Sequence, residues 1–128
     1  MIPSKNVGLC LDTWHWYVGG GTLQQLEDVA IDRLMMVRVA DLPADALLEA
    51  VTEQDRLLPG ATEVVPNSQW VKWLAAQGYE GPVTAYAHAA QFTGSTRTQS
   101  VEQTAEALNQ LLAQTTEEAE QIAAASSN

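Results

Sequence analysis

Three short apolar runs, separated by segments with helical spacing, constrain the fold of this chain more than any other feature. The runs are 7–11, 34–39 and 83–87, and each has the length of a strand rather than a helix. Their near-continuous apolar character is typical of parallel strands that are buried on both faces. Strands that alternate with helices favour a parallel sheet with right-handed crossover connections. The sequence therefore predicts an α/β fold of order β-α-β-α-β-α.

The segments between the apolar runs carry helix-start signals. Thr22 is followed three residues later by Gln25, a capping-box pattern, and apolar residues then recur at helical spacing as far as Ala30. Ser100 and Gln103 form the same pattern before a long amphipathic segment. Two further helices are predicted over 44–51 and 68–77, with a loop over 52–65 between them. Gly78 is the expected stop signal of the second of these helices.

Length and composition indicate one domain. The chain has 128 residues, which fits the usual range of about 100–200 residues per domain. We assign residues 1–114 to this domain and residues 115–128 to a polar tail rich in Glu, Ala and Ser, which is expected to fray. The single cysteine, Cys10, lies inside the first apolar run and is expected to be a buried thiol.

The charge balance limits the possible partners. Lys and Arg number 6, Asp and Glu number 16, and the formal net charge is −10. Such a charge repels phosphate backbones and anionic lipid surfaces, so neither nucleic acid nor a membrane is expected as a partner. No run approaches the roughly 18 apolar residues of a membrane span, and residues 1–6 lack a signal-peptide core. The sequence therefore predicts a cytoplasmic protein.

A three-stranded parallel sheet is incomplete as an isolated unit. It has two open edges and one poorly covered face, whereas parallel strands are normally buried on both sides. We therefore expect the chain to be part of a larger structure. Polar residues follow the first two runs, namely Asp12, His15 and Asp41. In barrels of alternating strands and helices, active sites collect at the C-terminal ends of the strands.

Four segments occur in series, in the order VGLCLDTWH (7–15), VRVADLP (37–43), RLLPG (56–60) and GYEGPVT (78–84). In this order they resemble the sugar-phosphate isomerases and epimerases of the xylose-isomerase-like TIM-barrel superfamily, which includes the family-2 apurinic endonucleases. The resemblance extends over about residues 7–113. It implies that the chain is the C-terminal part of such a barrel, a partial TIM barrel of about three of the eight parallel βα units.

The resemblance also implies a divalent metal site, with Mn, Mg or Zn held by two Glu, one Asp and one His. Asp12 matches the metal-ligating Asp of the family. Arg38 stands at the His position and Tyr86 at the last Glu position, and the strand with the first Glu lies upstream of the matched segments. A guanidinium has only hydrogen-bond donors and a permanent positive charge. We therefore expect no metal cofactor in the chain as written.

His15 and Arg56 are the candidate catalytic residues. The resemblance places His15 near the substrate, where it orients a hydroxyl or moves a proton. It gives Arg56 a contact with an anionic or hydroxyl group of the substrate, because the planar guanidinium suits such groups. The residues alone leave simpler alternatives open: Asp12 caps a turn, His15 packs among aromatic rings in a loop, and Arg56 pairs at the surface with Asp55 or Glu53.

Arg38 is unusual because it lies inside an apolar run, where an unpaired charge is costly. Either it neutralises Asp12 or Asp41, or it lies exposed at an open edge of the sheet. Tyr86 and His88 are two residues apart and are expected to share a strand face, with a role in core or rim packing. The glycines at 19–21 are interpreted as a flexible turn.

Two functions follow from these observations. The first is descent from a metal-dependent isomerase or epimerase, in which a carboxylate removes a proton next to a carbonyl and the cation stabilises the enediolate. Its ligand is a sugar or a sugar-phosphate-like molecule. We expect the isolated chain to be inactive, either truncated or completed by an upstream barrel segment from another chain. The alternative is a non-catalytic binding or assembly module that forms homo-oligomers through its open strand edges.

Overall fold

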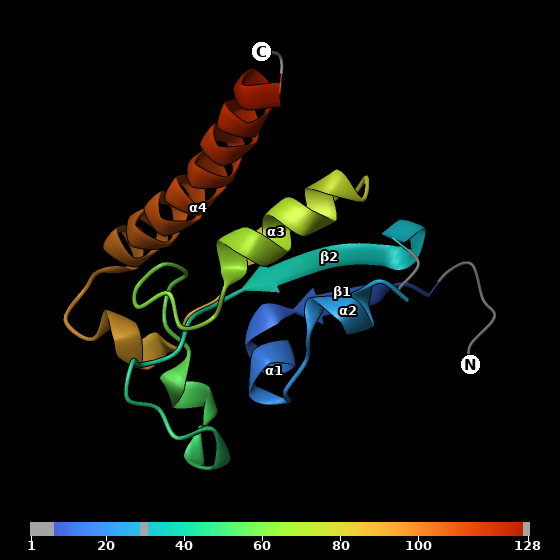
Figure 1. Cartoon of the computed structure of the whole chain (residues 1–128). Coiled ribbons are helices and arrows are strands. Elements are labelled where there is room, and N and C mark those ends of the chain that lie inside the picture. Colours follow the sequence, from blue (N-terminus) through green and yellow to red (C-terminus); the bar gives the residue numbers. More distant parts are fainter. Residues whose placement is uncertain (1–6, 29–30, 127–128) are drawn as a thin grey trace.

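The computed structural model describes residues 7–28 and 31–126, with side chains as far as Thr115. Its three strands are β1 (Leu9–Asp12), β2 (Leu34–Val39) and β3 (Val83–Ala85). They form one sheet in the order β1-β2-β3, and both neighbouring pairs are parallel. The predicted α/β fold with three parallel strands is therefore confirmed, and β1 and β3 are the two edges of the sheet (Figure 1).

Within the described ranges, four α-helices accompany the strands. They are α1 (Thr13–Val18), α2 (Leu23–Leu26), α3 (Asn67–Ala76) and α4 (Arg97–Ser126). Figure 1 shows α3 and α4 on the same side of the sheet, with α4 extending well beyond it. Because all three strands run in one direction, their carboxyl ends and the loops that follow lie together at one edge of the molecule (Figure 1).

The strand register divides the sheet into two faces. Leu11 lies opposite Val37, and Val37 lies opposite Val83, so these residues share the face that α3 and α4 cover. The main core on this side consists of Leu11, Leu26, Leu34, Val37, Val39, Val71, Leu74 and Leu111. Each fully buried Leu or Val contributes about 1.5–3 kcal/mol relative to an exposed one. This core therefore holds α3 and α4 against the sheet.

The other face carries the alternate residues of the strands. Cys10 lies opposite Met36, while Asp12, Arg38 and Thr84 form a row across all three strands. Cys10 is exposed, so its predicted burial is wrong. The reason is that β1 is an edge strand, and the two residues at its start are exposed rather than buried on both faces.

The loops at the carboxyl ends of the strands have their own small core. It contains Trp14, Ala40, Leu42, Val65 and Trp70, and it joins α1 to the start of α3. A buried hydrogen bond from the Thr13 hydroxyl to Asn67 connects the same two helices. Asn67 also donates from Nδ2 to the carbonyl of Ala40 at 2.8 Å. The residues that follow the strands are therefore fixed by packing rather than left as free loops.

The predicted helix boundaries are partly confirmed. The capping box of Thr22 and Gln25 is present at the start of α2, and the last residues predicted for that helix, including Ala30, lie outside the described part of the chain. The helix predicted over 68–77 is α3, and it ends before Gly78, whose φ of 96° suits glycine. Segment 44–51 contains only a 3-10 turn at Leu48–Ala50, because its leucines find no core and lie exposed.

Helix α4 begins one turn earlier than predicted. Thr96 accepts from the amide of Gln99 at 3.1 Å, and the Gln99 side chain accepts from the amide of Thr96 at 2.9 Å. These two bonds form the capping box in place of Ser100 and Gln103. The helix continues to Ser126, so the structure extends it through the polar segment that was expected to fray. No helix in the described ranges has the length and apolar character needed to cross a bilayer.

Candidate functional site

A group of polar and aromatic side chains lies where the three strands end. Asp12 is the last residue of β1, Arg38 is the second-last residue of β2, and Tyr86 follows β3 directly. The amide of Tyr86 donates to the carbonyl of Val39 at 3.1 Å, which keeps the ring beside the end of β2. The parallel register thus gathers residues far apart in the sequence at one edge of the sheet.

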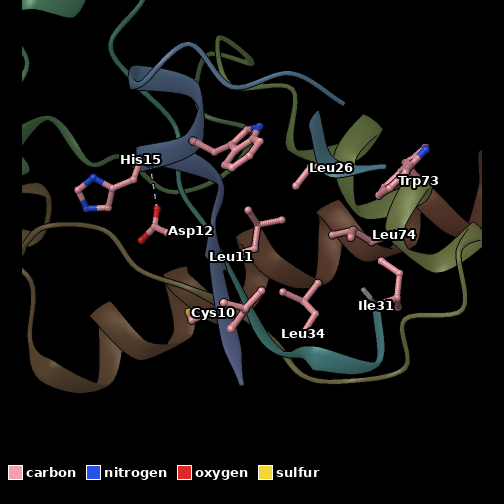
Figure 2. Close-up of a pocket in the computed structure, with 11 residues that line it drawn as sticks. Cys10, Leu11, Asp12, His15, Leu26, Ile31, Leu34, Trp73 and Leu74 are labelled. Atoms are coloured by element: carbon pink, nitrogen blue, oxygen red, sulfur yellow. Dashed lines mark hydrogen bonds between the residues drawn. The ribbon is translucent and has the colours of Figure 1, made fainter. Parts of the chain in front are cut away.

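Asp12 connects the first strand to a buried arginine. Its Oδ1 accepts from the backbone amide of His15 at 3.1 Å, which makes it the N-cap of α1. Its Oδ2 accepts from Nη2 of Arg56 at 2.7 Å. The side chain of Asp12 is 15% exposed. The capping role is therefore confirmed, and the same carboxylate also takes part in the polar cluster. Figure 2 shows Asp12 and His15 pointing away from the apolar side of β1.

Arg56 is the centre of the cluster. The ion pair with Glu53 that the residues left open is present, but the side chain of Arg56 is only 2% exposed and does not lie at the surface. Its Nε donates to Oε2 of Glu53 at 2.6 Å, in addition to the bond to Asp12. Burial alone lowers the pKa of Arg56, but the hydrogen bonds to Asp12 and Glu53 outweigh burial and raise the pKa above its ordinary value. Arg56 is therefore a permanent cation whose charge two carboxylates balance.

Aromatic rings complete the surroundings of Arg56. The guanidinium carbon lies 4.7 Å from the ring centre of Trp14 and 5.2 Å from that of Tyr86. Such contacts offset part of the cost of burying the charge. Nη1 is buried and has no hydrogen-bond acceptor among the residues that the structure describes. In this arrangement Arg56 contacts protein groups on all sides, and it holds Asp12 and Glu53 in place.

His15 lies at the open end of the cluster. Its side chain is 58% exposed, and its Nε2 lies 3.2 Å from Oε1 of Glu53. Its ring meets that of Trp14 edge to face, with the ring centres 5.0 Å apart. The predicted aromatic packing is present, although on helix α1 rather than in a loop. The three site residues predicted from the sequence, His15, Arg56 and Asp12, are thus brought together, with Glu53 between His15 and Arg56.

Arg38 does not have the role first predicted. Among the described residues it forms no ion pair with Asp12 or Asp41, since Arg56 binds Asp12 instead. Its guanidinium carbon lies 5.4 Å from the ring centre of Tyr86, and its side chain is half-buried. The side chain is therefore closer to the second alternative, in which Arg38 is exposed, although β2 is the central strand and not an open edge.

Asp41 organises a loop. Its side chain is fully buried and accepts four backbone N–H bonds, from Leu42 and Val65 on Oδ1 and from Thr62 and Glu63 on Oδ2. The distances lie between 2.7 and 3.0 Å. Backbone donors therefore satisfy this carboxylate, and no cation is needed to neutralise it.

The prediction of a shared strand face for Tyr86 and His88 is wrong, because β3 ends at Ala85 and the period of two ends with it. Of the predicted core or rim packing, Tyr86 has the rim alternative: it is 45% exposed and its ring contacts the guanidinium groups of Arg38 and Arg56. His88 accepts from the amide of Ala90 on Nδ1 at 3.1 Å and thereby caps a 3-10 turn. The capping role of His88 was not predicted from the sequence.

The donors around Asp12 do not form a metal site. Within the described residues, no three His, Cys, Asp or Glu side chains lie close enough together to hold an ion. Both oxygens of Asp12 already accept hydrogen bonds, one of them from a guanidinium. Divalent cations such as Mg²⁺ and Mn²⁺ prefer about six oxygen or nitrogen ligands. The residues present therefore do not fit the group that the resemblance implies.

An apolar pocket borders this cluster and has a different character. Its volume is about 440 Å³, and apolar residues of β1, α2, β2 and α3 line most of it. Figure 2 shows Leu11, Leu34 and Leu74 on one side of β1, with Asp12 at the rim. The pocket opens along the edge strand on the helix-covered side of the sheet. Its position is that of a gap next to an unpaired strand. Asp12 and His15 of the polar cluster border the pocket, whereas Glu53 and Arg56 do not line it.

Glu53 and Trp14 are the residues whose part in the cluster the sequence did not indicate. Glu53 was considered only as a surface partner of Arg56, three residues along the chain. Its carboxylate in fact joins Arg56 to His15. Trp14 was considered only as a neighbour of His15, and its ring also stacks on Arg56. The spacing of Glu53 and Arg56 was the available signal, since residues three apart face one another on a helical turn.

The strand order, the parallel register and the polar cluster at the carboxyl ends define a segment of an α/β barrel. The family model of the xylose isomerase-like TIM barrel matches residues 1–111, and the chain belongs to this family. Among characterised relatives, the inosose isomerase of Halalkalibacterium halodurans is 28% identical over 83 residues, which are 65% of this chain and 29% of that protein.

Three solved structures share the fold. A xylose isomerase domain-containing protein of Salmonella typhimurium superposes with a TM-score of 0.72 at 21% identity, over 82% of this chain. The IolI protein, solved with a bound zinc atom, superposes with a TM-score of 0.75 at 18% identity, over 87% of this chain. A xylose isomerase domain protein of Alicyclobacillus acidocaldarius superposes with a TM-score of 0.69 at 27% identity, over 88% of this chain. The chain covers 39% of each of these structures, which is consistent with a partial barrel.

Proposed function

We propose that this chain supplies the ligand-binding end of a xylose isomerase-like barrel and that it binds a polyhydroxylated small molecule without a metal ion. The remaining barrel units come from sequence outside these 128 residues or from another chain. One observation carries the proposal: Asp12, Arg56, Glu53 and His15 form one continuous hydrogen-bonded and ionic chain at the carboxyl end of β1. Ligands of such barrels bind at this end.

The roles of the four residues differ. His15 and Glu53 are more than half exposed and are the groups that contact ligand hydroxyls. Arg56 is a positioning residue, because its buried guanidinium fixes both carboxylates and does not reach solvent. Asp12 holds the backbone of His15 at the start of α1. Since Nε2 of His15 faces Glu53, this pair can accept or return a proton at a ligand hydroxyl.

The relatives support this class of ligand. One relative is named as an inosose isomerase, and an inosose is a polyhydroxylated ring with a carbonyl group. An isomerase of that kind moves a proton next to the carbonyl and requires a base and a group that stabilises the developing oxyanion. In this chain the cluster offers a proton-transfer pair but no metal donor set. We therefore assign it ligand binding, with isomerase activity absent in the isolated chain.

NMR titration of the chain with myo-inositol, a neutral polyol, tests the proposal. We expect saturable shifts of backbone signals at 12–15 and 53–56. The Glu53→Gln variant should weaken the binding at least fivefold, while Glu49→Gln, an exposed acid in the neighbouring turn, should leave it unchanged. Equal behaviour of the two variants, or shifts that do not saturate, would refute the proposal.

Metal titration of the same samples tests the second half of the proposal. We expect Mn²⁺, Mg²⁺ and Zn²⁺ to bind no better than they bind any acidic surface. The double change Arg38→His and Tyr86→Glu should increase the affinity, because it adds two ligand groups on the face that carries Asp12. Tight stoichiometric binding by the unaltered chain would show that the donor set has been misjudged.

A second candidate is the assembly module. The edge strand β1 exposes Leu9 by 51% and adjoins the apolar pocket of about 440 Å³. An unpaired parallel edge beside an apolar pocket favours association with another strand and helix. Light scattering after size-exclusion chromatography tests this function, which requires a discrete oligomer. A monomer at all concentrations would exclude it.

A further inference from the structure

Arg38 is the basic group of the cluster that no carboxylate neutralises. Arg56 is balanced by Asp12 and Glu53, whereas the side chain of Arg38 makes no ion pair and no hydrogen bond with any residue that the structure describes. The chain has only 6 basic residues among 128, so an unpaired arginine at this position is notable in an acidic protein. Its side chain is half-buried, and burying part of a charge without an acceptor costs free energy.

The surroundings hold Arg38 in place without occupying its donors. Its guanidinium carbon lies 5.4 Å from the ring centre of Tyr86, and Tyr86 in turn lies 5.2 Å from the guanidinium carbon of Arg56. A ring contact of this kind orients a guanidinium but leaves its in-plane N–H groups free. Thr84 lies opposite Arg38 in the register on the same face, which adds a hydroxyl beside it.

We propose that Arg38, supported by Tyr86 and Thr84, is a subsite for an oxyanion, either a carboxylate or a phosphate group of the ligand. A planar guanidinium binds both groups through two parallel N–H bonds. The arrangement separates two kinds of recognition: hydroxyl groups lie on the side of His15 and Glu53, and the anionic group lies on Arg38. This inference rests on the proposed function for the polyol part of the ligand, but the anion subsite stands on its own residues.

The nearby carboxylates do not prevent anion binding. Asp12 lies opposite Arg38 in the register, but its outer oxygen is bound to Arg56 at 2.7 Å, and Glu53 is bound to Arg56 at 2.6 Å. The guanidinium of Arg56, and not that of Arg38, therefore balances the negative charges of these two carboxylates. The net charge of −10 lowers the local concentration of anions at low salt. We therefore expect modest affinity, in the low millimolar range for a simple ion.

The test is an NMR titration with sodium phosphate, and separately with sodium acetate, at a constant ionic strength set by sodium chloride. The signals of the arginine Nε–H groups and the ring of Tyr86 report the binding site. We expect saturable shifts at Arg38 and Tyr86. Arg38→Gln should weaken the binding at least tenfold, whereas Arg97→Gln removes the same charge from an exposed position and should change it less than twofold.

Two further variants keep the test decisive if Arg38→Gln does not fold. Arg38→Lys retains the charge but loses the planar fork, so it should retain part of the affinity. Tyr86→Ala removes the support of the guanidinium and should also weaken binding. Equal effects of Arg38→Gln and Arg97→Gln, or shifts spread equally over Arg33 and Arg97, would overturn the subsite.

The two ligand classes separate this inference from the proposed function. Phosphate binding at Arg38 without myo-inositol binding overturns the proposed function and supports the subsite. Myo-inositol binding without an anion effect overturns the subsite alone. A polyol that carries an acid group, such as glucuronate or an inositol phosphate, should bind more tightly than either part. Its advantage should disappear in Arg38→Gln.

Discussion

Two arginines at the carboxyl ends of the strands show how little the residue type alone determines a role. Arg56 is buried and paired with two carboxylates, while Arg38 is half-buried and unpaired among the described residues. Sequence spacing did not indicate which guanidinium reaches Asp12, because Arg56 lies 44 residues away along the chain. Asp12 and Arg38 share the register of neighbouring strands, yet the long side chain from the loop forms the ion pair.

This difference predicts unequal costs of substitution. Arg56→Met should lower the free energy of unfolding by about 2 kcal/mol, because Asp12 loses a charged hydrogen bond that is shielded from water. Arg38→Met should cost less than about 1 kcal/mol, since it removes a single ring contact. Urea unfolding measures both values. A larger loss in Arg38→Met than in Arg56→Met would contradict the assignment of the two roles.

Asp41 allows a second prediction for a single side chain. Asp41→Asn replaces one acceptor oxygen by an amide nitrogen that faces two backbone N–H donors, so we expect a loss of about 2 kcal/mol in the free energy of unfolding. Amide hydrogens of 62–65 should exchange faster. Asp45→Asn, which changes an exposed acid in the same loop, is the control and should behave like the unaltered chain.

At the scale of secondary structure, the sequence indicates the strands better than the helices. Apolar runs of strand length marked all three strands. The central residues of a parallel strand are generally buried, so they are apolar almost regardless of the residues that flank the strand in the sequence. Helix α1 was missed, since its six residues contain three aromatic rings without a clear helical period. Segment 44–51 has that period but no core to pack against, and a helical pattern alone rarely stabilises so short a segment.

The start of α4 shows the limit of local signals. Both Thr96 with Gln99 and Ser100 with Gln103 have the spacing of a capping box. The structure uses the first pair, and the hydroxyl of Ser100 instead donates to the carbonyl of Thr96 at 2.9 Å. Local pattern alone cannot choose between two capping boxes that lie one turn apart.

The cap therefore gives a prediction at the scale of this helix. Thr96→Ala should lower the free energy of unfolding by about 1 kcal/mol, since it leaves the amide of Gln99 without its acceptor. Ser100→Ala should cost less than half of that value. Thermal unfolding followed by circular dichroism compares the two variants. A greater loss in Ser100→Ala would restore the helix start that the sequence first indicated.

For the molecule as a whole, the two open edges of the sheet are the main consequence of having three strands. The sequence predicted these edges, because three parallel strands cannot close on themselves. The candidate site was predicted only in part: its three residues were named, but Glu53 and Tyr86 enter it through loops whose course depends on the whole fold. Loops far apart in the sequence meet here only after the strands are in register.

Cys10 provides a direct probe of the β1 edge. It is the single cysteine of the chain and is exposed on the edge strand. We expect a maleimide reagent to label it in the folded protein at a rate within about tenfold of the labelling rate of the unfolded chain. Labelling should slow at concentrations where an oligomer forms, if the partner covers β1. Protection of Cys10 in a dilute monomer would show that the edge is covered by other parts of the chain.

The buried position of Arg56 also has a consequence for the order of events during folding. Its contacts come from the end of β1, from the turn before it and from the residue after β3, and its own carbonyl accepts from the amide of His88. These partners meet only when the three strands have assembled, so we expect the cluster to form late, after the rate-limiting barrier. Substitutions here should therefore accelerate unfolding while leaving the refolding rate almost unchanged. The cluster that prepares the site for a ligand then also determines how long the folded chain persists.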